Sequence, residues 1–224
     1  IDPTYGRIML GSNTKKGYSY NFTVELKKGF DSGFAGSIAY SYGDSYSIYD
    51  GTSSQNSSQW RGLHAINGRN FEQNVARSAF AQGSRVIAQV SYRKEYAGFM
   101  ASQIGLVYEG LSGGLTSYIY GSGDDLTNED SRNRALIWIP ADQSEINLID
   151  YTDGSGNTVT AAQQWAQLDA FIASDPYLSE NRGGYADRAR NRAPFSNVID
   201  LRFLQDFYIT MPSGKRNTLQ VSVD

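Results

Sequence analysis

The chain has 224 residues, a formal net charge of −3 and no cysteine. The missing cysteines exclude disulfides and thiolate metal sites, and the acidic balance argues against nucleic acid as a partner. Sixteen tyrosines and 23 glycines against five prolines favour long antiparallel strands over a helical protein. No apolar run approaches the roughly 18 residues of a membrane helix, but a strand that alternates hides its apolar face from averaged hydropathy.

Period-two alternation of apolar and polar residues predicts six strands. The first places Tyr18, Phe22 and Leu26 on one face and Glu25 and Lys27 on the other. The predicted strands cover residues 17–28, 34–42, 84–93, 99–109, 195–206 with an extension to about 210, and 218–224. In the fifth, Ile199, Leu201 and Phe203 share a face that Gln205 interrupts, while the opposite face carries charge.

Two long segments, approximately 43–83 and 110–194, lack this alternation. The second contains one predicted helix, since Thr160 and Gln163 form a capping-box pattern and Trp165, Leu168 and Ile172 recur at helical spacing. Asp175-Pro176 is expected to end this helix, and Trp165 is expected to pack in the core that the helix forms. The same segment contains a predicted small hairpin at 115–120 and an apolar run at 135–140 in which Trp138 is expected to be packed.

The connections alternate between short turns and long segments, as in outer-membrane barrels. Tyrosines are expected at the strand ends that adjoin the long segments, where a membrane interface would place them: Tyr18, Tyr20, Tyr40, Tyr42, Tyr92 and Tyr108. The predicted fold is therefore all-β: a segment of an antiparallel transmembrane β-barrel, about six strands of a larger barrel, with long extracellular loops of which one contains a short helix.

Several ordered motifs between residues 17 and 224 resemble one family. They are Ser91-Tyr92-Arg93-Lys94-Glu95-Tyr96, Tyr108-Glu109-Gly110-Leu111-Ser112-Gly113, Ser117-Tyr118-Ile119-Tyr120, Ala135-Leu136-Ile137-Trp138-Ile139-Pro140, Arg182-Gly183-Gly184-Tyr185-Ala186-Asp187-Arg188 and Asp200-Leu201-Arg202-Phe203-Leu204-Gln205-Asp206-Phe207. Together they resemble the C-terminal barrel region of TonB-dependent outer-membrane receptors of the SusC-like or Oar-like kind.

The resemblance implies a barrel of about 22 strands in the outer membrane of a Gram-negative bacterium. It implies import of a bulky nutrient (a glycan, a peptide or a metal chelate) with energy from the TonB system. The chain is then expected to be a fragment, residues 1–224 of a single barrel domain without the plug. The implied partners are the TonB complex through the missing plug, a surface lipoprotein of the SusD type, outer-membrane lipid and the nutrient.

The candidate substrate-binding residues lie in one loop and along the charged faces of the strands. They are Trp60, Arg85, Gln89, Arg93, Glu109 and Arg202. With Glu25, Lys27, Asp200 and Asp206, the charged members would line the barrel lumen, where they could brace neighbouring strands and the plug or follow the substrate path. Bracing is the favoured interpretation for most of them.

Other polar clusters are weaker candidates for a function. Asp124, Asp125 and Asp130 offer oxygens for calcium without the spacing of an EF-hand, so a solvated acidic loop is preferred. His64 is the only histidine, which leaves a zinc or catalytic site without partners. The arginines of 182–192 are expected to pair with lumen carboxylates. No enzymatic motif and no cofactor site is found.

A second hypothesis is a soluble or surface-exposed β-sandwich that binds ligand through its long loops. The two hypotheses differ in the surroundings of the apolar faces. In the receptor these side chains face lipid, whereas in the sandwich they form a dry core between two sheets. The residues that discriminate are Leu26, Ile38, Val90, Ile104, Leu201 and Val221.

Overall fold

The computed structural model describes residues 10–66, 68–69, 74–121 and 134–224. The chain divides into two compact units. The sheet unit comprises Ser19–Ser45, Ala81–Gly114 and Ala193–Asp224, and the loop unit comprises Ile1–Tyr18, Tyr46–Phe80 and Leu115–Arg192. Each unit is described by itself below.

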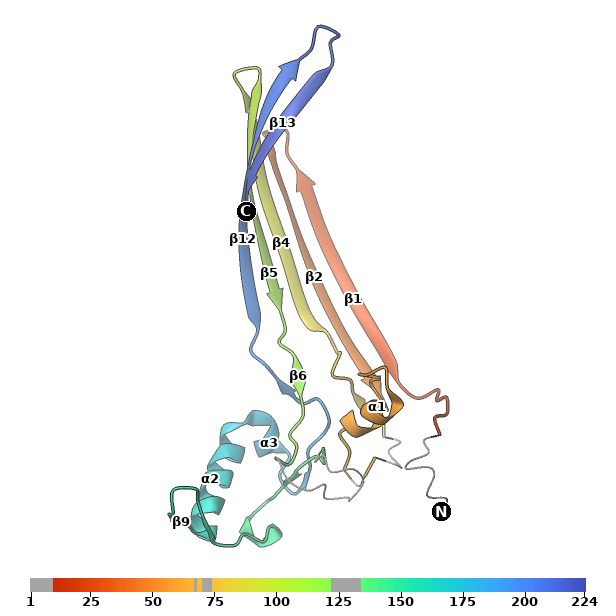
Figure 1. Ribbon diagram of the computed structural model, residues 1–224, viewed down its shortest axis with the longest axis vertical. Coiled ribbons are helices and arrows are strands. Elements are labelled where there is room, and N and C mark those ends of the chain that lie inside the picture. Colours follow the sequence, from red (N-terminus) through yellow and green to blue (C-terminus); the bar gives the residue numbers. More distant parts are fainter. Residues whose placement is uncertain (1–9, 67, 70–73, 122–133) are drawn as a thin grey trace. The chain divides into compact units, whose positions relative to one another are not determined.

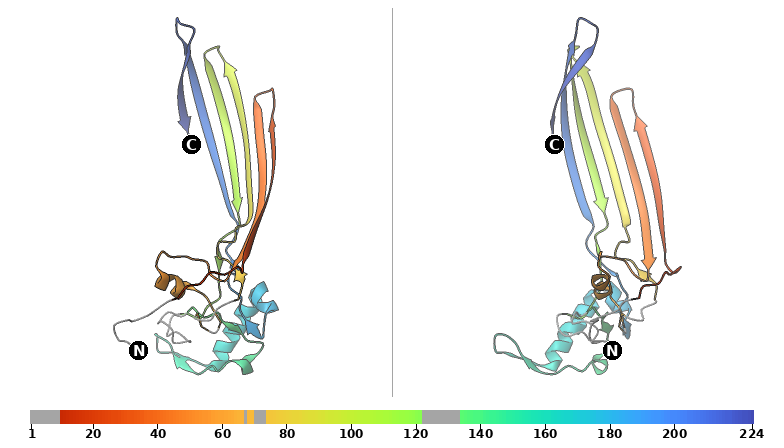
Figure 2. Two further views of the ribbon diagram at one scale, coloured as in Figure 1. Left: turned by 90° about the vertical axis from the view of Figure 1, so that its right-hand side faces the viewer. Right: turned by 45° about the vertical axis from the view of Figure 1, so that its right-hand side comes forward.

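Six long strands form the sheet unit and run side by side (Figure 1). Their bounds are β1 Tyr18–Gly29, β2 Phe34–Ser47, β4 Gly83–Tyr96, β5 Met100–Leu111, β12 Ser196–Thr210 and β13 Arg216–Val223. The order across the sheet is β1-β2-β4-β5-β12-β13, and the pairs from β2 to β13 are antiparallel. Two further views show one curved layer of strands (Figure 2). The sheet is open, with β1 and β13 at its edges.

All six predicted strands are confirmed, and two of them extend at least three residues beyond the predicted end. Strand β2 continues from residue 42 to Ser47, and β4 continues from residue 93 to Tyr96. The extensions contain Ser, Lys and Glu, and the apolar alternation fades in them. They are held in the sheet by backbone pairing with a neighbouring strand, which the pattern of side chains does not reveal.

The short turns all lie at one end of the sheet. Residues 30–33, 97–99 and 211–215 connect β1 to β2, β4 to β5 and β12 to β13. The register aligns these turns, because Met100 is opposite both Tyr96 and Phe207, and Tyr92 is opposite Phe34. Tyr92 is therefore at the short-turn end, and its predicted place beside the long segments is wrong.

The turn between β1 and β2 depends on Gly33. Its φ of +90° lies in the region that favours glycine, and a Cβ there would overlap the carbonyl oxygen of Arg93. The close approach of Gly33 to β4 allows a hydrogen bond, in which the backbone N–H of Arg93 donates to the carbonyl of Gly33 at 3.0 Å. The turn thus joins the first hairpin to the adjacent strand β4.

The loop unit is built from short elements. The helices are α1 Asn56–Gly62, α2 Ala161–Ser174 and α3 Pro176–Glu180, with a 3-10 turn η1 at Gln143–Glu145. The short strands are β3 Ala76–Arg77, β6 Leu115–Thr116, β7 Trp138–Ile139, β8 Tyr151–Thr152, β9 Thr158–Val159, β10 Gly184–Tyr185 and β11 Asn191–Arg192. No helix in the part of the chain that the structure describes is long and apolar enough to cross a membrane.

The predicted helix is confirmed as α2, including its capping box between Thr160 and Gln163. Leu168 and Ile172 pack into a small core around Ile139, Leu178 and Ala186. Trp165 was expected in this core but lies outside it and is only half-buried. Asp175 ends α2 as predicted and also caps α3, where Pro176 occupies the first turn that tolerates proline.

The predicted hairpin at 115–120 is wrong. Leu115–Thr116 pairs with Asn191–Arg192, far along the sequence. The apolar run at 135–140 likewise pairs at Trp138–Ile139 with Gly184–Tyr185. Helix α1 in the first long segment was not predicted, because its sequence NSSQWRG has neither an apolar stripe nor a side-chain cap.

Substitution of Gly33 by alanine should destabilise the sheet unit. The added Cβ is both strained at φ +90° and overlapped by the Arg93 carbonyl, so we expect a loss of about 2–3 kcal/mol in the free energy of unfolding. Urea unfolding in detergent micelles, followed by circular dichroism, measures it. The control is Gly29→Ala, where a Cβ meets nothing within 4 Å. Equal losses in the two variants would contradict the role given to Gly33.

Candidate functional site: the two faces of the sheet

The register gives the sheet one polar and one apolar face. Thr23 Oγ1 and Ser41 Oγ lie 3.0 Å apart, and Ser41 is opposite Arg85. Leu111 is opposite Arg85 on one side and Ser196 on the other. Because cross-strand partners point to the same side, all these residues share a face. The polar members of this face include Asn21, Thr23, Glu25, Lys27, Ser37, Ser41, Arg85, Gln89, Ser91, Arg93, Glu95, Gln103, Glu109, Ser196, Asp200, Arg202, Asp206, Tyr208, Thr210, Arg216, Thr218, Gln220 and Ser222.

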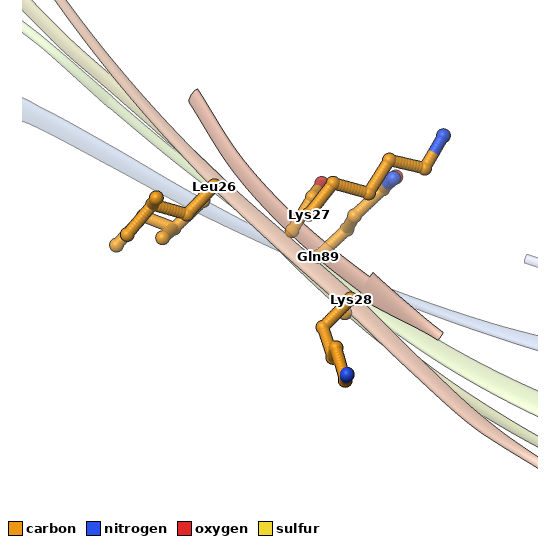
Figure 3. Close-up of a pocket in the computed structure, with 7 residues that line it drawn as sticks. Leu26, Lys27, Lys28 and Gln89 are labelled. Atoms are coloured by element: carbon orange, nitrogen blue, oxygen red, sulfur yellow. The ribbon is translucent and has the colours of Figure 1, made fainter. Parts of the chain in front are cut away.

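The alternation is visible directly in a close-up of β1 and β4 (Figure 3). Lys27 and Gln89 project to one side of the ribbon, and Leu26 projects to the other together with Lys28. The two sides of one strand therefore present different chemistry at neighbouring positions. Neighbouring residues can be used as matched pairs in experiments for this reason.

The apolar face is continuous across the sheet. One row runs from Val90 to Leu106 and then to Leu201, each the cross-strand partner of the next. The face consists of Tyr18, Tyr20, Phe22, Val24, Leu26, Phe34, Ile38, Tyr40, Tyr42, Val86, Val90, Tyr92, Met100, Ile104, Leu106, Tyr108, Ile199, Leu201, Phe203, Phe207, Ile209, Leu219, Val221 and Val223. The face is exposed: Leu26 is 69% and Leu201 58% accessible.

Aromatic side chains border the apolar face at both ends. Tyr20 and Tyr42 lie with ring centroids 6.3 Å apart at the end that adjoins the long segments. Phe34 and Tyr92 lie 4.4 Å apart at the short-turn end. Aliphatic residues dominate the rows between them. Sequence reasoning identified the first border and missed the second, which becomes visible only once the register places Tyr92 beside Phe34.

Two polar residues within the apolar face, Ser102 and Gln205, satisfy each other. Ser102 and Gln205 are cross-strand partners, and the Ser102 hydroxyl donates to Gln205 Oε1 at 2.6 Å. The Tyr96 hydroxyl donates to the same oxygen at 3.0 Å, and Gln205 Nε2 donates to the Ala101 carbonyl. The interruption at Gln205 seen in the sequence is therefore a closed hydrogen-bond cluster.

The polar face is braced around Asp206. This buried carboxylate accepts from Arg93 at 2.7 Å and from Gln220 Nε2 at 2.8 Å, and the Tyr208 hydroxyl also donates to it at 3.3 Å. Arg93 additionally donates to the Tyr208 hydroxyl. The cluster joins β4, β12 and β13 across β5, which supports a bracing role for Arg93 and Asp206.

The other predicted site residues on this face are more open. Arg85 and Glu109 form an ion pair at 2.6 Å between β4 and β5, and Arg202 pairs with Asp224 at 2.8 Å. Gln89 is exposed. The structure thus brings Arg85, Gln89, Arg93, Glu109 and Arg202 to one face. Gln89 is the uncharged member of this group, and none of the five is buried.

Trp60 does not belong to this group. It lies in the loop unit, on helix α1 rather than in an irregular loop as expected, and the Arg69 guanidinium stands 5.4 Å from its ring centroid. The acidic candidates Asp124, Asp125 and Asp130 lie outside the described residues. Within the described ranges, no group of three or more His, Asp or Glu side chains could hold a metal ion.

The arginines of 182–192 were expected to pair with lumen carboxylates, and for three of them this is wrong. Arg182 pairs with Asp169 at 2.7 Å and Arg190 with Asp187 at 3.1 Å, both within the loop unit. Arg188 is buried, and its guanidinium donates to the backbone carbonyls of Ser47, Ile48, Ala76 and Arg77.

The loop unit contains a cavity of about 300 Å³ beside His64. A parallel bridge between Ala65 and Ala135 places the preceding residues, His64 and Arg134, next to each other. Burial and then the charges of Arg134, Arg188 and Arg69 lower the pKa of His64 to about 4. His64 received no role from the sequence, because as the only histidine it lacks partners for a zinc or catalytic site; its proximity to Arg134 becomes visible only in the structure.

Asp50 is the carboxylate of this cavity. Burial by itself would raise its pKa, but hydrogen bonds from Ser47, the Ala79 N–H and Ser78, with the charge of Arg188, lower the pKa on balance. The Ser47 hydroxyl donates to Asp50 at 2.6 Å and the Ala79 N–H at 2.9 Å. The cavity thus keeps an ionised carboxylate whose oxygens already have donors.

Comparison with protein-family models, with curated proteins and with solved structures found no match for this chain.

Removal of the Asp206 charge should cost more stability than removal of an open ion pair. Asp206→Asn leaves the Arg93 guanidinium without its buried partner, whereas Glu109→Gln loosens a pair whose two side chains are 42% and 38% exposed. We expect the drop in urea midpoint to be at least about twice as large for Asp206→Asn. A larger drop for Glu109→Gln would contradict the bracing role.

His64 should titrate far below a free imidazole. Its side-chain ¹⁵N resonances are expected to show a midpoint near pH 4 instead of about 6.5. The unfolded state takes up the proton first, so stability should fall as the pH decreases from about 6.5 to 4. The variant His64→Gln should lose that part of the pH dependence. A midpoint at or above pH 6 would show that the imidazole is neither buried nor close to the arginines.

Proposed function

We propose that this chain forms part of an antiparallel transmembrane β-barrel in the outer membrane of a Gram-negative bacterium. The single observation that carries the proposal is the apolar face, which continues across six strands and leaves Leu26, Ile38, Val90, Ile104, Leu201 and Val221 exposed on the same side. A barrel that faces lipid with its outer side requires this arrangement.

The dimensions of the apolar face support the same proposal. On β12 it extends from Ile199 to Ile209, which is about 33 Å along the strand at roughly 3.3 Å per residue. A tilt of about 40° reduces this to about 25 Å along the barrel axis, the height of the apolar band of outer-membrane barrels. The aromatic borders at both ends are the girdles expected at the two interfaces.

Two further features of the sheet unit fit a barrel wall. Short turns lie at one end of the sheet, and the longer segments leave from the other, as in barrels with short periplasmic turns. In a bilayer the open edges of β1 and β13 would have to pair with further strands, because no water is present to satisfy their backbone groups. The resemblance to receptors of about 22 strands supplies such neighbours.

We further propose that the barrel is that of a TonB-dependent receptor of the SusC-like or Oar-like kind, which imports a bulky nutrient with energy from the TonB system. The motifs that carry this resemblance support it. The polar face would then line the lumen, with Asp206 and Arg93 as a brace and Arg85, Gln89, Glu109 and Arg202 open to substrate or plug. The TonB complex and a surface lipoprotein of the SusD type are the corresponding partners.

The alternative, a β-sandwich binding module, needs a second sheet against the apolar face. The exposure of Ile199 at 67% and Leu219 at 63% does not favour it. The first experiment is therefore membrane fractionation of the cell that makes the protein. A heat-modifiable species in the outer membrane supports the barrel, and a soluble species of 24.7 kDa contradicts it.

Adjacent residues of β12 give a sharper test. Leu201 is on the apolar face and Asp200 on the polar face. Leu201→Arg should weaken folding into lipid vesicles by about 1–3 kcal/mol, because the position lies between the interface and the midplane, where a charge costs about 2–4 kcal/mol, and Asp200→Arg by less than about 1 kcal/mol. The measurement is urea-dependent folding into phosphocholine vesicles. Equal effects at the two positions would argue against lipid on the apolar side.

A further inference from the structure

The cavity beside His64 belongs to no part of the proposed barrel wall. All of its lining residues lie in the loop unit. We propose that it is a binding site for a small organic anion that carries hydroxyl groups, with Arg134 as the residue that binds the carboxylate. This proposal does not depend on a membrane location, because the loop unit has its own core around Ile139, Ile172 and Leu178.

The size of the cavity sets the size of the ligand. A volume of about 300 Å³ equals that of about ten water molecules in the liquid, and it lies at the lower end of the range for ligand sites. A molecule of roughly ten to fifteen non-hydrogen atoms, such as a sugar acid, matches this volume. A larger glycan or peptide could place only one terminal group in it.

The walls of the cavity are held by backbone pairing between distant segments. The Ala65–Ala135 bridge fixes His64 beside Arg134, and the Leu136 N–H donates to the Ala65 carbonyl at 3.0 Å. The wall around Thr116 is held by the pairing of β6 with β11. A site with walls of this kind is largely formed before a ligand arrives.

The charges around the cavity favour an anion. Asp50 is the carboxylate in its lining. It already accepts hydrogen bonds from the Ser47 hydroxyl and the Ala79 N–H, and the charge of Arg188 acts on it. The Arg188 guanidinium already donates its hydrogen bonds to backbone carbonyls. Arg134 and Arg69 act on His64 as further positive charges. The balance is positive, and a guanidinium binds a carboxylate with two parallel hydrogen bonds.

Arg134 is the lining arginine that remains available. Within the described part of the chain its side chain has neither a hydrogen bond nor an ion pair, whereas Arg188 has several. Neutral groups that could bind ligand hydroxyls line the same cavity: the imidazole of His64, the hydroxyl of Tyr49 and the hydroxyl of Thr52. At neutral pH the imidazole is uncharged, so it can donate through one nitrogen and accept through the other.

The single histidine makes the test specific. With ¹⁵N-labelled histidine, the full chain in detergent micelles gives imidazole signals from His64 alone. The probe is D-glucuronate, and the controls are D-glucose, which lacks the carboxylate, and acetate, which lacks the hydroxyls. We expect glucuronate to shift the His64 signals with a dissociation constant of order 1 mM, at least about tenfold tighter than either control.

Substitution of Arg134 should remove this preference. Arg134→Gln is expected to weaken glucuronate binding at least about tenfold, and Arg134→Lys, which keeps the charge but loses the paired geometry, less strongly. The matched control is Arg190→Gln, which removes an arginine that is paired with Asp187 outside the cavity lining. An unchanged far-ultraviolet circular dichroism spectrum without ligand verifies that each variant is folded.

Three results would overturn the proposal. They are no shift of the His64 signals with 50 mM glucuronate (a probe concentration about 50-fold above the expected constant), equal shifts with glucose, and equal affinity in the Arg134→Gln and wild-type chains. Each is independent of the outcome of membrane fractionation. Failure of this proposal therefore leaves the barrel proposal untouched, and the reverse also holds.

Discussion

The register between neighbouring strands is the constraint on which the sheet unit depends. Each pairing from β2 to β13 places apolar side chains opposite apolar ones, as in the row of Val90, Leu106 and Leu201. A slip of one residue in any pairing would move a whole strand's apolar set to the charged side. The short turns hold this register, and the glycine at position 33 allows the first of them to approach β4 closely enough to bond with it.

The same register determines how polar groups are satisfied on both faces. Gln205 and Ser102 would each be costly in an apolar environment, but as direct partners they share one hydrogen-bond cluster. On the opposite face Asp206 gathers donors from three strands. The loop unit does not depend on strand register. It is held by a compact core between α2, α3 and the short strands.

Strand positions and the helix α2 could be predicted, since both rest on local periodicity and on a cap formed within four residues. What could not be predicted rests on contacts between distant segments. Nothing local connects Leu115 with Arg192, or His64 with Arg134, and so the hairpin at 115–120 was wrong and the cavity was missed. The charged candidates were assigned to the correct face by alternation alone, but their ion-pair partners required the register.

Arg188 has a consequence for how this protein can change over evolution. Its guanidinium fastens Ser47 and Ile48 to Ala76 and Arg77, next to the pairing of β2 with β3. Both ends of the intervening segment are therefore anchored by one distant side chain, and the entropy cost of lengthening such a closed segment grows only slowly. New sequence, including a foreign epitope, could be inserted between the anchors while β2 and β3 keep their pairing, as long as position 188 remains arginine.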